Sequence, residues 1–202
     1  MIFLYSILFP LKMISKKLPK NLTLKEVKKL LNLPRKITPI GLRNEAILKI
    51  MLFAGLRVSE VIHLKNEDLD LESGRLKIIA GKGNKDRNLL VPDKILDLLR
   101  EYRRWKPRSI FFFPTLKGKS LSPFYIWVMI KRKAKKAGIK SHCSPHTLRH
   151  TFATEFYRKT QDLEALRLCL GHENISTTQI YLSLANLEVE LKMKNFDFSP
   201  DL

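Results

Sequence analysis

The stretch SPHTLRHTFAT, residues 144–154, is the segment from which the fold and the function can be worked out. His146 and His150 stand four residues apart, and on a helix this spacing points both imidazoles to one side, as in some zinc sites. Arg149 follows His146 by three residues and shares that face, so its guanidinium would repel a metal dication. We therefore expect no metal here, and the role of the stretch depends on the residues that join it from elsewhere in the chain.

The chain is strongly basic. Its 202 residues include 38 lysines and arginines against 19 acidic residues, a formal net charge of +19 with an isoelectric point near 10.1. In a globular protein this balance indicates a polyanionic partner, and double-stranded DNA is the leading candidate. An anionic membrane is the alternative, but no segment approaches the roughly 18–20 apolar residues that span a bilayer. We expect DNA binding and no membrane association.

The N-terminal segment MIFLYSILFPLKM, residues 1–13, has the apolar character of a targeting signal. No basic residue precedes its apolar run and no small-residue cleavage site follows, so we expect residues 1–21 to be a linker, a docking segment or the remnant of an upstream region. Cys143 and Cys169 are far apart and lack the paired spacing of a metal knuckle. Two such thiols fit a reducing, cytoplasmic setting.

Most of the chain has helical periodicity. Thr23 and Glu26 have the spacing of a capping box before an apolar repeat, and Gly55 is the expected end of a second helix. A short helix is expected to restart at Arg57. Further helices are predicted at residues 93–105 and 122–138, and from Pro145 onward, with a last amphipathic piece through about Lys194.

A change of pattern follows Gly74. The stretch GRLKIIAGKGNKDRNLLVP, residues 74–92, has two short β-prone runs around a turn and predicts an antiparallel hairpin with Lys82 at its tip. The segment SIFFFP, residues 109–114, is a plausible third strand. The expected fold class is α+β, mainly α, with a small antiparallel three-stranded sheet.

Five short motifs follow one another along the chain: GLRVSE at 55–60, GKG at 81–83, HTLRH at 146–150, LGH at 170–172 and STTQIY at 176–181. Together they resemble the tyrosine recombinase family, which includes the phage integrases and Xer proteins. The resemblance covers about residues 22–191 and implies a helical catalytic domain over residues 22–202 with a C-terminal tail helix. It also implies an enzyme, a site-specific DNA recombinase or integrase that cuts and rejoins strands through a 3′-phosphotyrosyl intermediate.

The resemblance assigns a role to each motif residue. The implied catalytic residues are Arg57, Lys82, His146, Arg149, His172 and the nucleophile Tyr181, and the supporting residues are Glu60 and His150. Two guanidinium groups can stabilise the charge that develops on a phosphodiester without a metal. His146 is the best base for the tyrosine, and Lys82 could protonate the leaving 5′ oxygen. No cofactor and no ATP are implied.

Other basic residues are candidates for DNA contact. Asn84 and Lys85 follow the hairpin lysine, and a basic cluster near residue 133 comprises Lys131, Arg132, Lys133, Lys135 and Lys136. This cluster could equally be a solvated helix end. Without the other motifs, Tyr181 would likewise be read as an ordinary half-buried aromatic residue of a helix.

The two ends of the chain compare differently with the family. Family members usually have an upstream helical domain that grips the DNA, and only residues 1–21 stand there, so a partner could supply the missing half of the clamp. The tail after Tyr181 has apolar residues that, by resemblance, would dock on a neighbouring subunit in a tetramer on DNA; packing within the same chain is the alternative. Two rival functions remain open, a DNA-binding remnant or regulator without turnover, and a topoisomerase with type IB-like covalent chemistry.

Overall fold

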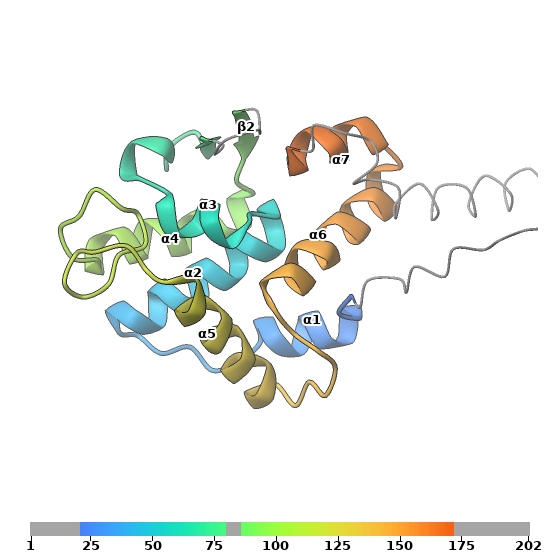
Figure 1. Cartoon of the computed structure of the whole chain (residues 1–202), viewed down its shortest axis with the longest axis horizontal. Coiled ribbons are helices and arrows are strands. Elements are labelled where there is room, and N and C mark those ends of the chain that lie inside the picture. Colours follow the sequence, from blue (N-terminus) through green and yellow to red (C-terminus); the bar gives the residue numbers. More distant parts are fainter. Residues whose placement is uncertain (1–20, 80–85, 172–202) are drawn as a thin grey trace, which may run out of the picture.

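The computed structural model describes residues 21–79 and 86–171, and every structural statement below concerns these two ranges (Figure 1). Their elements are, in order, α1 (Leu24–Leu31), α2 (Pro39–Ala54), α3 (Val58–His63), the short 3-10 helix η1 (Asn66–Asp68), β1 (Arg75–Ile78), β2 (Arg87–Leu90), α4 (Asp93–Trp105), α5 (Pro123–Lys136), α6 (Pro145–Thr160) and α7 (Leu163–Leu170). The predicted class, mainly helical with a small antiparallel sheet, is confirmed.

Side-chain caps fix where the first helices begin. The expected capping box is present at α1, where the Glu26 backbone N–H donates to Thr23 Oγ1 at 3.2 Å and the Thr23 N–H donates to Glu26 Oε2 at 2.8 Å. Helix α2 begins at Pro39 and ends at the expected Gly55. Thr38 Oγ1 accepts from the Gly41 N–H and proline suits the first helical position, so the cap fixes the start of the helix.

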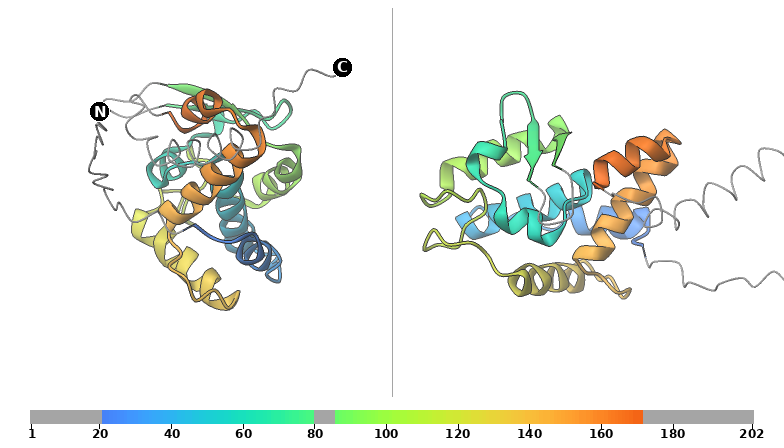
Figure 2. Two further views of the ribbon diagram at one scale, coloured as in Figure 1. Left: turned by 90° about the vertical axis from the view of Figure 1, so that its right-hand side faces the viewer. Right: turned by 45° about the horizontal axis from the view of Figure 1, so that its top comes forward.

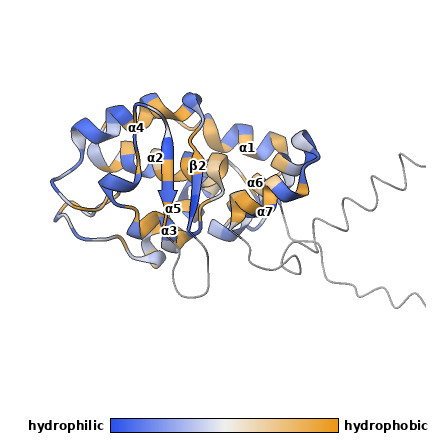
Figure 3. Cartoon of the chain, turned by 90° about the horizontal axis from the view of Figure 1, so that it is seen from above, coloured by the Kyte–Doolittle hydropathy of each residue, from blue (hydrophilic) through white to orange (hydrophobic). Residues whose placement is uncertain are grey.

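Helix α2 forms the centre of the core. It packs against α4 and α6, and most of its residues are buried, among them Ala46, Ile47 and Met51 with no exposed surface. Its C-terminal half, residues 46–54, has one charged residue, Lys49, and such a predominantly apolar stretch is stable only when neighbouring elements cover most of it, which explains this position. The outer helices carry hydrophilic and hydrophobic sides (Figure 3). None of the helices in residues 21–79 and 86–171 is long and apolar enough to cross a membrane.

The hairpin forms as expected. Strands β1 and β2 pair antiparallel, with Arg75 opposite Leu90 and Ile78 opposite Arg87. The hairpin lies beside α7 (Figure 2, right). Its expected tip, Lys82, is outside the described residues.

The predicted third strand is wrong in detail, because the described sheet has two strands. Within residues 109–114, Phe111 makes one isolated bridge with Lys65. Phe112 and Phe113 follow each other and are both buried, so the segment lacks the alternation of a strand with one solvated face. Both rings pack instead on Tyr102 of α4, with ring centroids 5.9 and 5.6 Å away. Two backbone hydrogen bonds flank the bridge, from the Asn66 N–H to the Ile110 carbonyl at 3.0 Å and from the Phe112 N–H to the Leu64 carbonyl at 2.7 Å. The segment is therefore held by this short pairing and by aromatic packing on α4, without joining the sheet of β1 and β2.

Candidate active site

Gly55 allows α2 to end and α3 to start within a few residues. Its φ of +64° lies in the left-handed region, and a Cβ added there would lie 2.3 Å from a ring carbon of Phe152. Glycine therefore satisfies both the turn and the close approach of α6. The turn places Arg57 directly before α3 and Glu60 one turn into it.

The Glu60 carboxylate binds both the main chain and the side chain of Arg57. The Arg57 backbone N–H donates to Glu60 Oε2 at 2.7 Å, and Arg57 Nη1 donates to Glu60 Oε1 at 3.1 Å. The Glu60 side chain is 7% exposed, whereas that of Arg57 is 28% exposed. Arg57 is thus anchored at one edge while part of its guanidinium reaches the surface.

Arg149 of α6 approaches the same carboxylate from the other side of the core. Its Nη1 donates to the carbonyl oxygen of Gly55 at 2.6 Å, and its Nη2 donates to that of Leu170 at 2.7 Å. These carbonyls lie at the C-terminal ends of α2 and α7, where helices leave acceptors unused. Arg149 Nη1 also lies 3.9 Å from Glu60 Oε2. The structure therefore brings together three of the predicted residues, Arg57, Glu60 and Arg149.

Arg87 is a member of this group that the sequence analysis missed. From β2 its Nη1 and Nη2 donate to Glu60 Oε1 and Oε2 at 2.8 and 2.9 Å, and its Nε donates to the Cys169 carbonyl at 2.8 Å. The side chain is 7% exposed. The signal in the sequence was its place two residues before Leu89, on the same inward face of a short strand. A buried arginine needs hydrogen-bond partners for its guanidinium, and Glu60 supplies both a pair of acceptors and a compensating charge.

Three guanidinium groups and one carboxylate leave a formal surplus of two positive charges in this group. Burial by itself would raise the pKa of Glu60, but the hydrogen bonds and charge of Arg87 oppose it, followed by the Arg57 N–H and the charge of Arg149. Together they outweigh burial, and the pKa lies below its usual value. Glu60 is therefore ionised at neutral pH. Such a surplus, presented partly at the surface by Arg57, is suited to an anion such as a phosphodiester.

The two histidines of α6 lie at the N-terminal part of the helix, which Ser144 caps through the Thr147 N–H. His146 is exposed and His150 is half-buried. Burial, and then the charges of His146 and Arg149, lower the pKa of His150. A neutral His150 at physiological pH fits a supporting role beside Arg149. In residues 21–79 and 86–171, no group of three or more His, Cys, Asp or Glu side chains could hold a metal ion.

Five predicted residues lie outside the described ranges: Lys82, Asn84, Lys85, His172 and Tyr181. Of the basic cluster on α5, Lys131, Arg132, Lys135 and Lys136 are exposed. Lys133 is half-buried, and burial lowers its pKa although the nearby Glu45 opposes this. The structure therefore offers four of the five cations to solvent, and Lys131 Nζ lies 4.2 Å from the centroid of the Trp127 ring.

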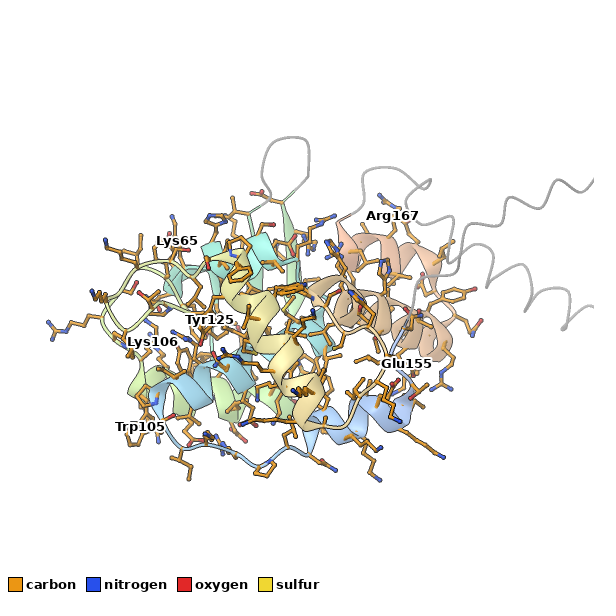
Figure 4. All side chains as sticks on the ribbon, turned by 60° about the horizontal axis from the view of Figure 1, so that its bottom comes forward. Lys65, Trp105, Lys106, Tyr125, Glu155 and Arg167 are labelled. Carbon is orange, nitrogen blue, oxygen red and sulfur yellow. The ribbon has the colours of Figure 1, made fainter. Side chains whose placement is uncertain are left out.

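A cavity of about 390 Å³ lies elsewhere. It is lined by Asn66, Arg103, Lys106, Pro107, Arg108 and Ser109. Lys106 marks its place at the end of α4, far from Arg167 of α7 (Figure 4). None of the lining residues belongs to the arginine group on Glu60.

Comparison with known proteins gives the same assignment as the motifs. The model of the phage integrase family matches residues 20–188. Tyrosine recombinase XerD of Listeria innocua is 40% identical over 187 residues, which cover 89% of this chain and 63% of that protein. Tyrosine recombinase XerA of Pyrococcus furiosus is 41% identical over 172 residues, 83% of this chain and 58% of that protein. The chain thus spans less than two thirds of either relative.

Solved structures of Xer recombinases have the same fold. The crystal structure of XerA recombinase superposes with a TM-score of 0.75 at 29% identity, covering 90% of this chain and 67% of that one. XerH site-specific recombinase, in a pre-cleavage complex bound to its difH substrate, gives 0.72 at 34% identity, covering 82% and 51%. The chain therefore belongs to the phage integrase family of tyrosine recombinases.

Proposed function

We propose that the protein is a site-specific DNA recombinase that cuts and rejoins strands through a 3′-phosphotyrosyl intermediate on Tyr181, without metal or ATP. The observation that best supports this is the meeting of Arg57 and Arg149 at Glu60, with positive charge in excess. Hydrogen-bond donors held in place before the substrate arrives stabilise the charge of a phosphoryl transition state most effectively. Oriented guanidinium groups also occur in proteins that bind DNA phosphates without turnover, so the covalent adduct is what separates the two functions.

In the proposed reaction the Tyr181 oxygen attacks the scissile phosphorus. The bond from phosphorus to the 5′ oxygen breaks, leaving a 3′-phosphotyrosine and a 5′-hydroxyl. Ionising a tyrosine with a pKa of about 10 at neutral pH costs roughly 4 kcal/mol. A base must therefore accept the proton of Tyr181, and His146 has this role. Lys82 donates a proton to the 5′ oxygen, and His172 and the arginines bind the nonbridging oxygens. Attack by a 5′-hydroxyl on the phosphotyrosine reverses every step, so rejoining needs no ATP.

Double-stranded DNA is the proposed substrate. The net charge of +19 and the exposed cations of α5 support contact with the phosphate backbone, together with Asn84 and Lys85. The DNA complex of XerH, at 34% identity, supports the same partner. We propose further that the tail after Tyr181 docks on a neighbouring copy to build a tetramer on DNA, and that a partner can complete the clamp around it.

The test uses a library of duplexes of random sequence, each with a nick close enough to the cleavage site that the short fragment carrying the new 5′-hydroxyl diffuses away. The chain is incubated with the library in EDTA, and covalent adducts are recovered from a denaturing gel. We expect an adduct with wild type and none with Tyr181→Phe. Arg149→Lys keeps the charge but loses the bidentate geometry, and it should slow adduct formation by about a hundredfold or more.

Two outcomes would change the assignment. DNA binding without an adduct from the wild-type chain would indicate the non-catalytic DNA-binding protein. An adduct accompanied by relaxation of supercoiled plasmid by the monomer, without paired sites, would indicate the topoisomerase.

A further inference from the structure

We propose that Arg87 is a positioning residue that holds Glu60, the hairpin and the end of α7 in one arrangement, and thereby aligns the phosphate-binding arginines. The proposal deepens the proposed function and rests on it. Arg87 belongs to none of the five motifs. Within residues 21–79 and 86–171, its side chain donates hydrogen bonds to Glu60 and to the carbonyl oxygen of Cys169.

The contacts of Arg87 use two edges of its guanidinium. One edge, formed by Nη1 and Nη2, makes a bidentate pair with both oxygens of Glu60 at 2.8 and 2.9 Å. The Nε on the other edge donates to the main chain at Cys169 at 2.8 Å. A planar group bonded on two edges fixes both the rotation and the position of its partner, so the Glu60 carboxylate has one orientation. That orientation is the one in which Oε2 accepts the Arg57 N–H and Oε1 accepts Arg57 Nη1.

The chain around α7 is shaped to admit this side chain. Gly171 follows Leu170 with a φ of +62°, and a Cβ at Gly171 would lie 2.9 Å from Arg87 Nη1 and 3.1 Å from its Cδ. The glycine of the LGH motif thus has a second use besides ending the helix, because it leaves room for the Arg87 guanidinium.

Arg87 and its partner Cys169 both lie close in the sequence to proposed catalytic residues. Arg87 begins β2, five residues after Lys82, and Cys169 precedes His172 by three residues. One side chain therefore connects the base of the hairpin, the end of α7 and Glu60. The hairpin leads to Lys82 and the end of α7 leads to His172, both proposed catalytic residues. A displacement of Arg87 would therefore disturb these two segments and the arginines at Glu60 together.

A purely structural ion pair is the competing interpretation, since a buried arginine beside a buried glutamate can serve stability alone. The two interpretations differ in what a conservative change does. Arg87→Lys keeps the charge but can bond only as a point donor, so it would leave Glu60 free to rotate. A structural pair would lose stability only, whereas a positioning residue would lose rate in a protein that is still folded and bound to DNA.

The experiment measures single-turnover adduct formation at saturating concentrations of a duplex recovered from the random library, with DNA affinity and the melting temperature measured in parallel. Arg87→Lys and Arg87→Gln are compared with wild type and with Arg75→Lys, a matched control on the exposed side of β1. We expect the rate of the Arg87 variants to fall about tenfold to a hundredfold because a small misplacement of donors is costly. Affinity should stay within about twofold, because the Arg87 side chain is buried and offers little surface to the DNA backbone.

The double variant Arg87→Lys with Glu60→Gln gives a second readout. If Arg87 acts through Glu60, the double variant should be little slower than Glu60→Gln alone. A rate for folded Arg87→Lys within twofold of wild type would overturn the proposal, as would full additivity in the double variant. Failure of both Arg87 variants to fold would show a structural role and refute it. Absence of an adduct from wild type would refute the proposed function, and this role with it.

Discussion

Replacing Glu60 with glutamine keeps the shape of the side chain and removes its charge. Glu60 accepts two hydrogen bonds from Arg57 and two from Arg87, and its side chain is 7% exposed. Glutamine has one acceptor oxygen, so its NH₂ group would face N–H donors and three guanidinium groups would lose their anion. Removing one partner of a buried ion pair costs about 3–5 kcal/mol. Because domains are stable by about 5–15 kcal/mol, Glu60→Gln should remove a large part of the free energy of unfolding.

The pKa of Glu60 determines how this loss depends on pH. Burial acts to raise it, but the contacts with Arg87, Arg57 and Arg149 together outweigh burial, so the folded-state pKa lies below the ordinary value of 4.5. A carboxyl group with a lowered pKa stabilises the folded state above its unfolded pKa, and this contribution is lost as the pH falls through the folded pKa. The gap in unfolding free energy between wild type and Glu60→Gln should be full at neutral pH and should narrow below pH 4.5.

Urea unfolding followed by circular dichroism, from neutral pH down to about pH 3, measures this gap. Glu155→Gln is the matched control. Glu155 pairs with Arg158 at 2.8 Å with side chains 26% and 54% exposed, and such surface pairs contribute less than about 1 kcal/mol. A loss for Glu60→Gln no larger than the control, or a gap that does not narrow in acid, would refute the assignment of Glu60 as the ionised centre of the arginine group.

Two further substitutions test the surroundings of the site by urea unfolding. Gly55→Ala should lose more than about 1 kcal/mol through the positive φ and the clash with α6, whereas Gly138→Ala has a similar φ and open space and should lose less; equal losses would contradict the clash. Tyr125→Phe should lose about 1–3 kcal/mol, because its hydroxyl accepts a 2.6 Å hydrogen bond from the buried Arg43. Tyr102→Phe is its control, since that buried hydroxyl has no hydrogen-bond partner in the described part of the chain, and a larger loss there would be inconsistent with this explanation.

Local signals in the sequence account for most of the fold. The capping box of Thr23 and Glu26, the glycine end of α2 and the hairpin are each encoded within a few residues, so pattern and turn chemistry predicted them. The prediction of a third strand at residues 109–114 was wrong because Phe112 and Phe113 pack on α4. A β-prone composition does not reveal which neighbour a segment will contact.

The site was predictable to the extent that motif order is informative. Arg57, Glu60 and Arg149 were found by resemblance, and their hydrogen bonds join residues that are adjacent only in the fold. Arg87 was missed because its partner Glu60 lies 27 residues away, and a single arginine in a hairpin looks like a solvated residue. The partial burial of Lys133 is equally a tertiary effect, because the periodicity of α5 alone does not show how closely the helix approaches Glu45.

The way in which each arginine is held determines how much charge is left for a phosphate. Arg87 is neutralised by Glu60 through a bidentate pair, so its charge serves the carboxylate. Arg149 is oriented mainly by the carbonyls of Gly55 and Leu170 at two helix ends. A carbonyl dipole fixes a guanidinium without cancelling its formal charge, and the negative end of a helix favours a cation there. Arg149 can therefore be rigid and still strongly attract an anion, and this combination is what transition-state stabilisation by preorganised donors requires.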